Sequence, residues 1–180
     1  MSYGERIYVL DSSSLITPYR NYYAPSIAPT FWQKLGGLIK QGTICTIDKV
    51  RDEIFRIDDN LKDWFRKTFD ALPVPFSKRR QNNNLFAFGE AIELSAYQQI
   101  IDWVSENNHF EENAKNEFKS SDIADAFLVA FCKAHNLILV TEEKYNPNIK
   151  KRIPIPNVCR DFSVLHIGLF DMMKELGIQL

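Results

Sequence analysis

The sequence predicts an α/β protein, a three-layer α/β/α sandwich with a central, mainly parallel sheet. Short apolar runs of strand length, such as Arg6–Leu10 and Leu137–Val140, alternate with longer segments in which apolar residues recur at helical spacing. Strands separated by helices need crossover connections, which give parallel strands covered by helices. A chain of 180 residues suits one domain of this kind, so we expect residues 1–180 to form a single domain.

The first half of the chain is expected to contain two strands and three helices. The first strand stops at Asp11 and three serines, and Gly42 marks the end of the first helix. In order, we expect a strand over Arg6–Leu10, an irregular connection over Asn21–Thr30, a helix over Phe31–Gln41, a strand over Thr43–Ile47 and two helices between Val50 and Leu72, broken near Asp58–Asn60.

The second half is expected to contain three helices and a final buried strand. Pro154 and Pro156 interrupt the run Ile153–Val158, so this run is expected to be at most an edge strand. In order, we expect a surface loop over Pro73–Asn84, a helix over Ala91–Val104, a helix over Ser120–His135, a strand over Leu137–Val140 that ends in Thr141, and an amphipathic helix over Ser163–Leu176 that Gly177 terminates.

Composition excludes some classes of protein. Lys and Arg together number 22 against 23 Asp and Glu, a formal charge of −1, which argues against binding nucleic acid by bulk positive charge but not against acting on it locally. The apolar runs are too short to span a membrane, so we expect a cytoplasmic protein without a membrane partner. The three cysteines, Cys45, Cys132 and Cys159, form no C-x-x-C pair and are expected to be buried, reduced thiols.

Acidic residues follow or precede the predicted strands at positions that can meet at one edge of the sheet. Asp11 ends the first strand, Glu142 and Glu143 follow the last, and Asp122 and Asp125 begin the helix that leads into it. Glu53 lies on the helix after the second strand. Ligands of open parallel sheets bind outside the carboxyl ends of the strands, so these side chains are candidates for one site.

Converging carboxylates repel one another unless cations neutralise them. Oxygen donors of this kind suit Mg²⁺ or Mn²⁺, and such ions support hydrolysis at phosphorus by activating water. The sequence contains no His-x-x-His, His-Glu-x-x-His or G-x-S-x-G pattern, which argues against a zinc or serine hydrolase. The residues therefore predict a metal-dependent phosphoesterase.

Each acid also has a structural interpretation. Asp11 is suited to cap the following helix, and Asp122 to favour a helix N-terminus through the helix dipole. Glu53 is close in sequence to Lys49, Arg51 and Arg56, with which it would form solvated pairs. Of Glu142 and Glu143, only one is expected to point inward. The structural interpretation is weaker for Asp125, because this residue directly precedes an apolar helix, where burying an unpaired carboxylate would cost several kcal/mol.

Three segments resemble the PIN-domain nucleases. They read I-Y-V-L-D-S-S-S-L-I over residues 7–16, V-R-D-E-I over residues 50–54 and D-A-F-L-V-A-F-C-K-A-H-N-L-I-L-V-T over residues 125–141. The later V-T-E-E and R-I-P-I-P-N-V-C resemble a PIN-like branch found among toxin–antitoxin genes. The resemblance implies that Asp11, Glu53 and Asp125 are the central metal-binding acids, that Glu143 is the fourth, and that Ser13 or Ser12 supports the first.

By this resemblance the protein would be a Mg²⁺- or Mn²⁺-dependent endoribonuclease, the toxin of a toxin–antitoxin pair. RNA would be its substrate, an antitoxin protein its partner, and a homodimer its assembly. We count Asp122 as a further candidate metal ligand. Substrate contacts are expected from Ser13, Thr141, Lys144, Lys150, Lys151 and Arg152.

Charged and aromatic segments have two interpretations. The basic residues after Glu143, and a second cluster at Lys78–Arg80, either contact phosphate at the rim of the acidic site or are solvated loops. The acid-rich segment 102–125 is expected to face away from the site, because it would repel RNA. The aromatic residues are expected in the core, and His109, His135 and His166 in surface or core positions rather than as ligands.

Three function classes compete. The complete set of acids favours the ribonuclease over a non-catalytic or regulatory PIN-like binding module. A receiver-like phosphoacceptor domain would need a second acid beside the first strand, where the sequence has Ser12 and Ser13.

Overall fold

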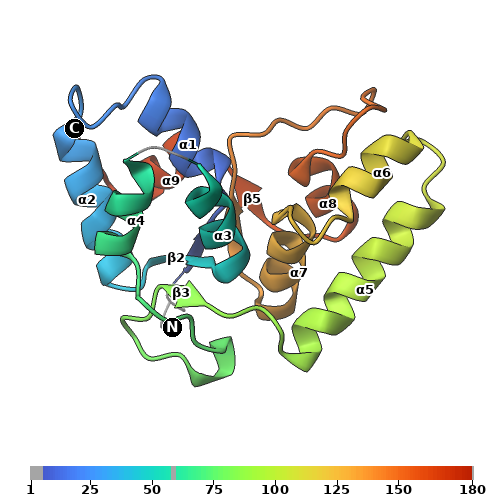
Figure 1. The fold of residues 1–180 in the computed structure, drawn as a ribbon, viewed down its shortest axis with the longest axis horizontal. Coiled ribbons are helices and arrows are strands. Elements are labelled where there is room, and N and C mark those ends of the chain that lie inside the picture. The colour runs from blue at the N-terminus through green and yellow to red at the C-terminus, as the bar shows by residue number, and fades with distance from the viewer. Residues whose placement is uncertain (1–5, 58–59, 180) are drawn as a thin grey trace.

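The computed structural model describes residues 6–57 and 60–179. Within them the strands form one sheet of order β3-β2-β1-β4-β5, in which every neighbouring pair is parallel. Helices flank this sheet (Figure 1), as expected for the predicted α/β class. The strands are β1 Tyr8–Leu10, β2 Ile44–Ile47, β3 Leu85–Phe86, β4 Ile138–Val140 and β5 His166–Ile167.

The first strand is central, which decides what meets at the edge of the sheet. Val9 of β1 is opposite Cys45 of β2 on one side and Leu139 of β4 on the other. All three side chains are fully buried, as β-branched and apolar residues in a doubly covered parallel sheet are. Residues that follow β1 and β4 therefore lie next to each other at the carboxyl edge.

The helices predicted over Phe31–Gln41, between Val50 and Leu72 and over Ala91–Val104 are present, whereas other helices were not predicted or differ from the prediction. The helices are α1 Ser13–Arg20, α2 Pro29–Lys40, α3 Asp48–Arg56, α4 Leu61–Thr68, α5 Ala91–Glu106, α6 Glu112–Phe118, α7 Asp125–His135, α8 Ile155–Asp161 and α9 Leu169–Glu175, with a 3-10 turn at Phe76–Lys78. The predicted break near Asp58–Asn60 includes Asp58 and Asp59, which lie outside the described residues.

Two predicted elements are wrong. The run Ile153–Val158 is not an edge strand: from Ile155 onward it belongs to the helix α8. Pro154 precedes that helix and Pro156 lies in its first turn, where no backbone N–H is needed. The predicted helix Ser163–Leu176 is instead the strand β5 followed by the helix α9, with Gly168 between them. Gly177 does terminate α9, with φ of +65°.

A third boundary matters for the site. The predicted helix Ser120–His135 begins only at Asp125, so the residues before it, including Asp122, form turns. The helix α7 itself is buried almost all round and ends at Asn136, which has the left-handed φ of 54°. Three elements had no counterpart in the prediction: α1, α6 and β3.

The core lies on both faces of the sheet and is rich in aromatic rings. One stack joins the sheet to α7: Phe86 and Phe131 have ring centroids 5.9 Å apart, and Phe76 contacts both. Cys45, Cys132 and Cys159 are buried free thiols, as predicted. Among the described residues, no helix combines the length and the apolar character that crossing a membrane requires.

Candidate metal centre at the carboxyl edge of the sheet

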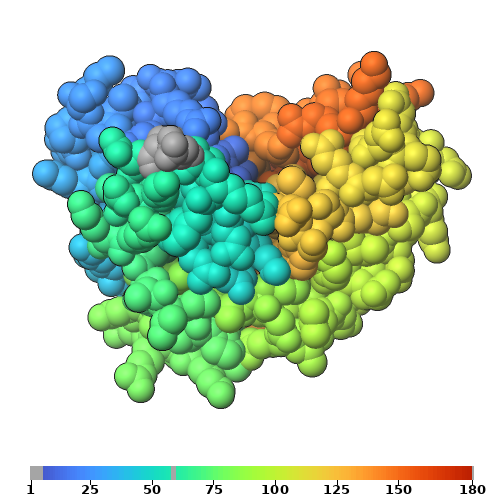
Figure 2. All heavy atoms as spheres, viewed as in Figure 1, coloured from blue at the N-terminus to red at the C-terminus, as the bar shows by residue number. Residues whose placement is uncertain are grey.

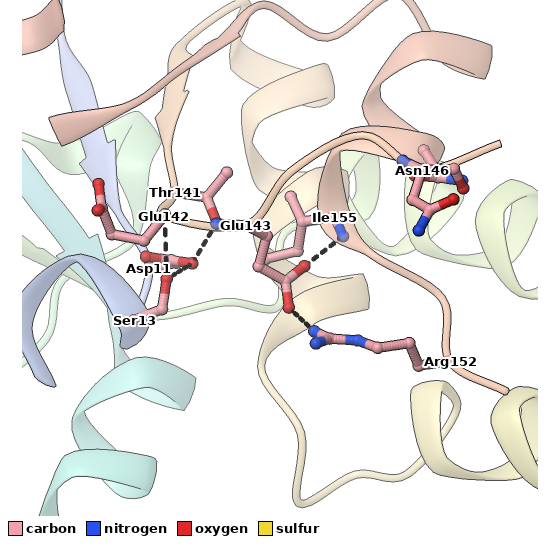
Figure 3. Close-up of polar contacts among 9 residues, drawn as sticks. Asp11, Ser13, Thr141, Glu142, Glu143, Asn146, Arg152 and Ile155 are labelled. Carbon is pink, nitrogen blue, oxygen red and sulfur yellow. Dashed lines mark hydrogen bonds and ion pairs between the residues drawn. The ribbon is translucent and has the colours of Figure 1, made fainter. Parts of the chain in front are cut away.

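Asp11 directly follows the central strand and is held by three hydrogen bonds. Its Oδ2 accepts from Ser13 Oγ at 2.7 Å and from Thr141 Oγ1 at 2.6 Å, while Oδ1 accepts from the backbone N–H of Ser14 at 2.7 Å. Figure 3 shows the hydroxyls of Ser13 and Thr141 directed at this carboxylate. The bond to Ser14 satisfies a backbone N–H in the first turn of α1, although Ser12 and not Asp11 is at the N-cap position.

Burial dominates the titration of Asp11. The side chain is 3% exposed, and this burial raises its pKa to about 6, although the hydrogen bonds from Thr141, Ser14 and Ser13 act in the opposite direction. Asp11 is therefore a fixed carboxylate whose negative charge is only partly compensated by the chain.

Glu53 and Asp125 come together through the backbone. Glu53 lies on α3, and its Oε1 accepts the backbone N–H of Ala124 at 2.7 Å, immediately before Asp125 at the start of α7. The nearby bases are engaged elsewhere, because Arg51 pairs with Asp52 and Arg56 with Asp122. The structure therefore holds Glu53 against α7 rather than in solvated pairs along its own helix.

The charge of Asp125 is affected by the three other candidate acids. Its pKa is raised well above the ordinary value, first by burial and then by the negative charges of Glu143, Glu53 and Asp11; the charge of Arg152 opposes the rise. Charges act on one another most strongly at short range and away from bulk water. Glu143, Glu53 and Asp11 are therefore close enough to Asp125 to disfavour its charge, although no three of these four acids bring ligand atoms within 4.8 Å of one another in the described part of the chain.

The two consecutive acids after β4 point in different directions (Figure 3). Glu142 accepts hydrogen bonds from Tyr22 Oη at 2.9 Å and from the backbone N–H of Leu169 at 3.1 Å. Glu143 accepts the backbone N–H of Ile155 at 2.7 Å and pairs with Arg152. Because Glu143 is the one that acts on Asp125, it is the candidate fourth acid.

A groove leads from Asp125 to the surface. It has a volume of about 420 Å³, and Phe118, Ile123 and Arg152 line it together with Asp125. All the described residues that line it come from segment 114–153, coloured yellow and orange in Figure 2, and the wider hollow beside the blue-to-cyan N-terminal segments in that view is a separate feature of the surface. Glu117 also lines this groove, so the acid-rich segment 102–125 faces the site in part, contrary to expectation.

Of the other predicted site residues, some contact the four acids and some are exposed away from them. The Asp122 side chain is 75% exposed and forms an ion pair with Arg56 at 3.2 Å. Lys144, Lys150 and Lys151 are exposed, whereas Arg152 reaches Glu143. Ser13 and Thr141 contact Asp11 directly, and they also accept the backbone N–H groups of Glu142 and Glu143, both at 3.1 Å.

Of the two interpretations of the second basic cluster, the structure favours the exposed loop over a place at the rim of the acidic site. Lys78–Arg80 precede β3, so they lie toward the amino edge of the parallel sheet and not at the rim of the acidic site. The loop from Pro73 to Asn84 does lie at the surface as predicted, with Phe76 as its buried anchor.

The donor set of the four acids fits a hard divalent cation. Carboxylate oxygens are the ligands that Mg²⁺ and Mn²⁺ prefer, and the excess of negative charge around Asp125 is the condition under which a cation binds favourably. Ser13, Thr141, Ser14 and Ala124 fix the orientation of two of the four carboxylates through hydrogen bonds.

In the described part of the chain, the group whose ligand atoms lie closest to the arrangement of a metal site is one that was not predicted, and it does not include the four acids. One ligand atom each from Glu90, Glu93 and His135 lie within 4.8 Å of one another, where the start of α5 meets the end of α7. His135 Nε2 is 2.7 Å from Glu93 Oε1, and Glu93 Oε2 accepts the backbone N–H groups of Gly89 and Glu90. The three side chains are thus already hydrogen-bonded to one another or to backbone groups, and Glu90 and Glu93 form the capping box at the start of α5. The Glu-x-x-Glu spacing before an apolar helix was the available signal.

Comparison with known proteins gives a family but no activity. Residues 8–180 match the model of a family described as a domain of unknown function, DUF4411. No curated protein matches the chain. Among solved structures, a chain of the "Crystal structure of VapBC2 from Rickettsia felis bound to a DNA fragment from their promoter" is similar, with 12% identity, a TM-score of 0.49, and coverage of 90% of this chain and 98% of that chain. Because the family model spans nearly the whole sequence, the chain belongs to the DUF4411 family.

Proposed function

We propose that this protein is a Mg²⁺- or Mn²⁺-dependent nuclease, with Asp11, Glu53, Asp125 and Glu143 as the metal-binding acids. The observation that carries the proposal is the raised pKa of Asp125, which burial raises first and the negative charges of Glu143, Glu53 and Asp11 raise further. The choice of RNA as substrate, and the role of a toxin restrained by an antitoxin, rest on the resemblance of residues 7–16, 50–54 and 125–141 to PIN-domain nucleases.

The proposed chemistry assigns distinct tasks to the residues of the site. A divalent cation bound there would lower the pKa of a water molecule and screen the phosphate charge. Ser13 and Thr141 hold Asp11 in one orientation, and the N–H of Ala124 does the same for Glu53. Both acids would therefore be positioned before any ligand arrives, which lowers the cost of assembling the site.

Arg152 is the candidate phosphate contact. Its side chain is 55% exposed at the groove and pairs with Glu143. A guanidinium matches the oxygens of a phosphate with two parallel hydrogen bonds. When cations neutralise Glu143, Arg152 would be available to turn towards a phosphodiester in the groove.

The test is cleavage of a labelled single-stranded RNA in Mn²⁺, in Mg²⁺ and in EDTA. We expect Asp11→Asn and Asp125→Asn each to reduce the metal-dependent rate by about 100-fold or more, because each removes a charged ligand. Asp122→Asn is the matched control: it also removes one aspartate charge close to α7, but that side chain is exposed and paired with Arg56, so its rate should stay within about twofold.

Two results would contradict the proposal in different ways. Cleavage that survives in both Asp11→Asn and Asp125→Asn would exclude the acidic site as the source of activity. Calorimetric binding of Mn²⁺ without cleavage of any RNA tested would favour the alternative, a non-catalytic binding module. The antitoxin and homodimer remain predictions from the resemblance, which pull-down from native cells and light scattering would examine.

A further inference from the structure

A concave pocket of about 430 Å³ lies at the amino edge of the sheet, at the opposite ends of the strands from the acids. Three segments that precede strands line it: Arg6 before β1, the turn that contains Gln41 before β2, and the loop that contains Arg79 and Arg80 before β3. The loop before β3 lies at the bottom of Figure 1, beside the label N. The pocket is therefore separate from the proposed metal centre.

The pocket concentrates positive charge. Its lining includes three arginines, Arg6, Arg79 and Arg80, and among the described residues that line it none is acidic. Arg6 also forms an ion pair with Glu175, at 3.2 Å. The guanidinium of Arg79 lies 4.3 Å above the ring of Phe76, which fixes its position without neutralising it. A concave surface lined by charge of one sign concentrates the field and attracts an anion.

The walls of the pocket are already held in place. Gly42 has φ of +79°, and a side chain there would collide with the backbone carbonyl of Gln81, so the turn and the loop pack backbone against backbone. The loop closes on itself, because the Arg80 N–H donates to Asn83 Oδ1 at 2.8 Å and the Asn83 N–H donates to the Arg80 carbonyl at 3.0 Å. A ligand would find the site formed, which favours binding.

We propose that this pocket binds a phosphate-bearing ligand of nucleotide size. Arg79 and Arg80, with Arg6, would hold the phosphate oxygens, because guanidinium groups pair with phosphate through charge-assisted, often bidentate hydrogen bonds. The side-chain amides of Gln41 and Gln81 would face the polar groups of an attached sugar or base. The volume falls within the range of about 300 to 1,000 Å³ that is typical of small-ligand sites.

The ligand chemistry has two sources, a free nucleotide or the phosphorylated end of an RNA strand. Calorimetric titrations of the full chain in EDTA would use 5′-AMP, inorganic pyrophosphate, adenosine, citrate and a 5′-phosphorylated oligoribonucleotide as probes. EDTA keeps divalent cations from the acidic site, so the result does not depend on the proposed nuclease. We expect 5′-AMP and pyrophosphate to bind at one site, and adenosine not to bind.

The variants separate the pocket from general surface charge. Arg79→Gln combined with Arg80→Gln should weaken 5′-AMP binding by about tenfold or more, because charge-assisted hydrogen bonds are lost. Lys78→Gln, one position away and outside the pocket, is the matched control and should change affinity by less than about twofold. Gln41→Glu leaves the packing of Arg79 on Phe76 intact, yet adds a negative charge to the lining, and should also weaken binding severalfold.

The titrations can overturn the proposal. It fails if the wild type binds neither 5′-AMP nor pyrophosphate, if citrate binds as tightly as both, or if Lys78→Gln weakens binding as much as the double variant. Should the double variant fold poorly by circular dichroism, unchanged 5′-AMP affinity in Gln41→Glu would equally exclude the pocket. A phosphorylated oligonucleotide that binds more tightly than 5′-AMP would identify a strand end as the ligand, and equal affinity a free nucleotide.

Discussion

The carboxylate of Asp125 lies where burial and three neighbouring acids all disfavour its charge. Proteins place such groups where a ligand or a proton compensates them, so strongly perturbed acids cluster at functional sites. Asp11 is in a similar position, but three hydrogen bonds from the chain relieve it in part. The two acids therefore differ in what compensates their negative charge. Hydrogen-bond donors of the protein do so for Asp11, whereas for Asp125 the compensation comes from Arg152 and from a ligand bound in the groove.

Removing the charge of Asp125 should stabilise the protein in the absence of metal. The folded-state pKa of Asp125 lies above its ordinary value of 3.8, so between these two values the folded state holds more protons than the unfolded state, and stability falls as pH rises. In EDTA at pH 8 we expect Asp125→Asn to melt about 2 °C or more above the wild type, measured by differential scanning calorimetry. The difference should shrink near pH 4.

Mn²⁺ should reverse the order of the melting temperatures of the wild type and Asp125→Asn. Mn²⁺ binds only the folded wild type and should raise its melting temperature in proportion to the logarithm of its concentration, but should leave Asp125→Asn unchanged. Asp122→Asn serves as the control and should melt within about 1 °C of the wild type in both conditions, because Asp122 is exposed. A lower melting temperature for Asp125→Asn in EDTA at pH 8 would contradict the electrostatic account.

At the scale of elements, contacts between helix ends assemble both charged clusters. Asp11 accepts a backbone N–H in the first turn of α1, and Glu53 of α3 accepts the backbone N–H just before α7. At the other end of α7, His135 reaches the buried Glu93 at the start of α5. The helix α7 thus connects the proposed metal centre with a polar junction at its far end, and α5 packs along its length.

The junction of Glu93 and His135 should give the protein a specific acid sensitivity. Burial raises the pKa of Glu93, but the hydrogen bonds from His135 and from the N–H groups of Gly89 and Glu90 outweigh it, so the folded pKa lies below 4.5. The stability from this interaction is therefore complete above pH 4.5 and is lost as pH falls through the folded pKa.

The corresponding variant is Glu93→Gln, followed by urea unfolding at several pH values between about 3.5 and 7. We expect a loss of about 1–3 kcal/mol at pH 7, because a buried hydrogen-bonded charge is replaced, and a smaller loss at the acid end. Glu106→Gln on the same helix is exposed and should behave like the wild type throughout. An equal loss at every pH would show that the effect is packing rather than ionisation.

Two glycines test the close approach of the turn before β2 to the loop before β3. Gly42→Ala should destabilise the protein by about 1–3 kcal/mol or more, because alanine disfavours φ of +79° and its Cβ would strike the Gln81 carbonyl. Gly37→Ala is the matched control: it lies inside α2 with open space around it, and should stabilise the protein by about 0.5–1 kcal/mol. Chemical denaturation measures both, and a neutral Gly42→Ala would disprove the close approach.

Local patterns predicted most elements but failed where proline was ambiguous. Apolar spacing located α2, α5, the body of α7, and the strands β1, β2 and β4 within a few residues. The segment after Arg152 was misread, because Pro154 and Pro156 are compatible both with an edge strand and with the first turn of a helix. Only packing against α7 and the contact of Glu143 with Ile155 favour the helix. The two-residue strands β3 and β5 are too short to show a period.

At the scale of the whole molecule, the net charge is near zero but the positive and negative charges are separated. Acids gather at the carboxyl edge of the sheet, around Asp125, whereas the arginines of the basic pocket lie at the amino edge. A parallel sheet produces this arrangement, because all of its strands begin at one edge and end at the other. The two proposed sites can therefore be studied separately, one through divalent cations and the other through phosphate ligands in their absence.

Periodicity and strand-end positions, which are local properties, are enough to derive the α/β class, the place of Asp11 at the end of a strand and the candidacy of Asp125, whereas the central position of β1 is known only from the structure. The choice between Glu142 and Glu143 depended instead on Tyr22 and Leu169 on one side and on Arg152 and Ile155 on the other. In the same way, the hydrogen bond between Glu53 and Ala124 joins residues 71 positions apart in the chain. The loop that contains Arg79 and Arg80 lies at the amino edge of the sheet, opposite the acids. These outcomes belong to the tertiary structure, because they depend on which segments pack together and not on the residues next to them in sequence.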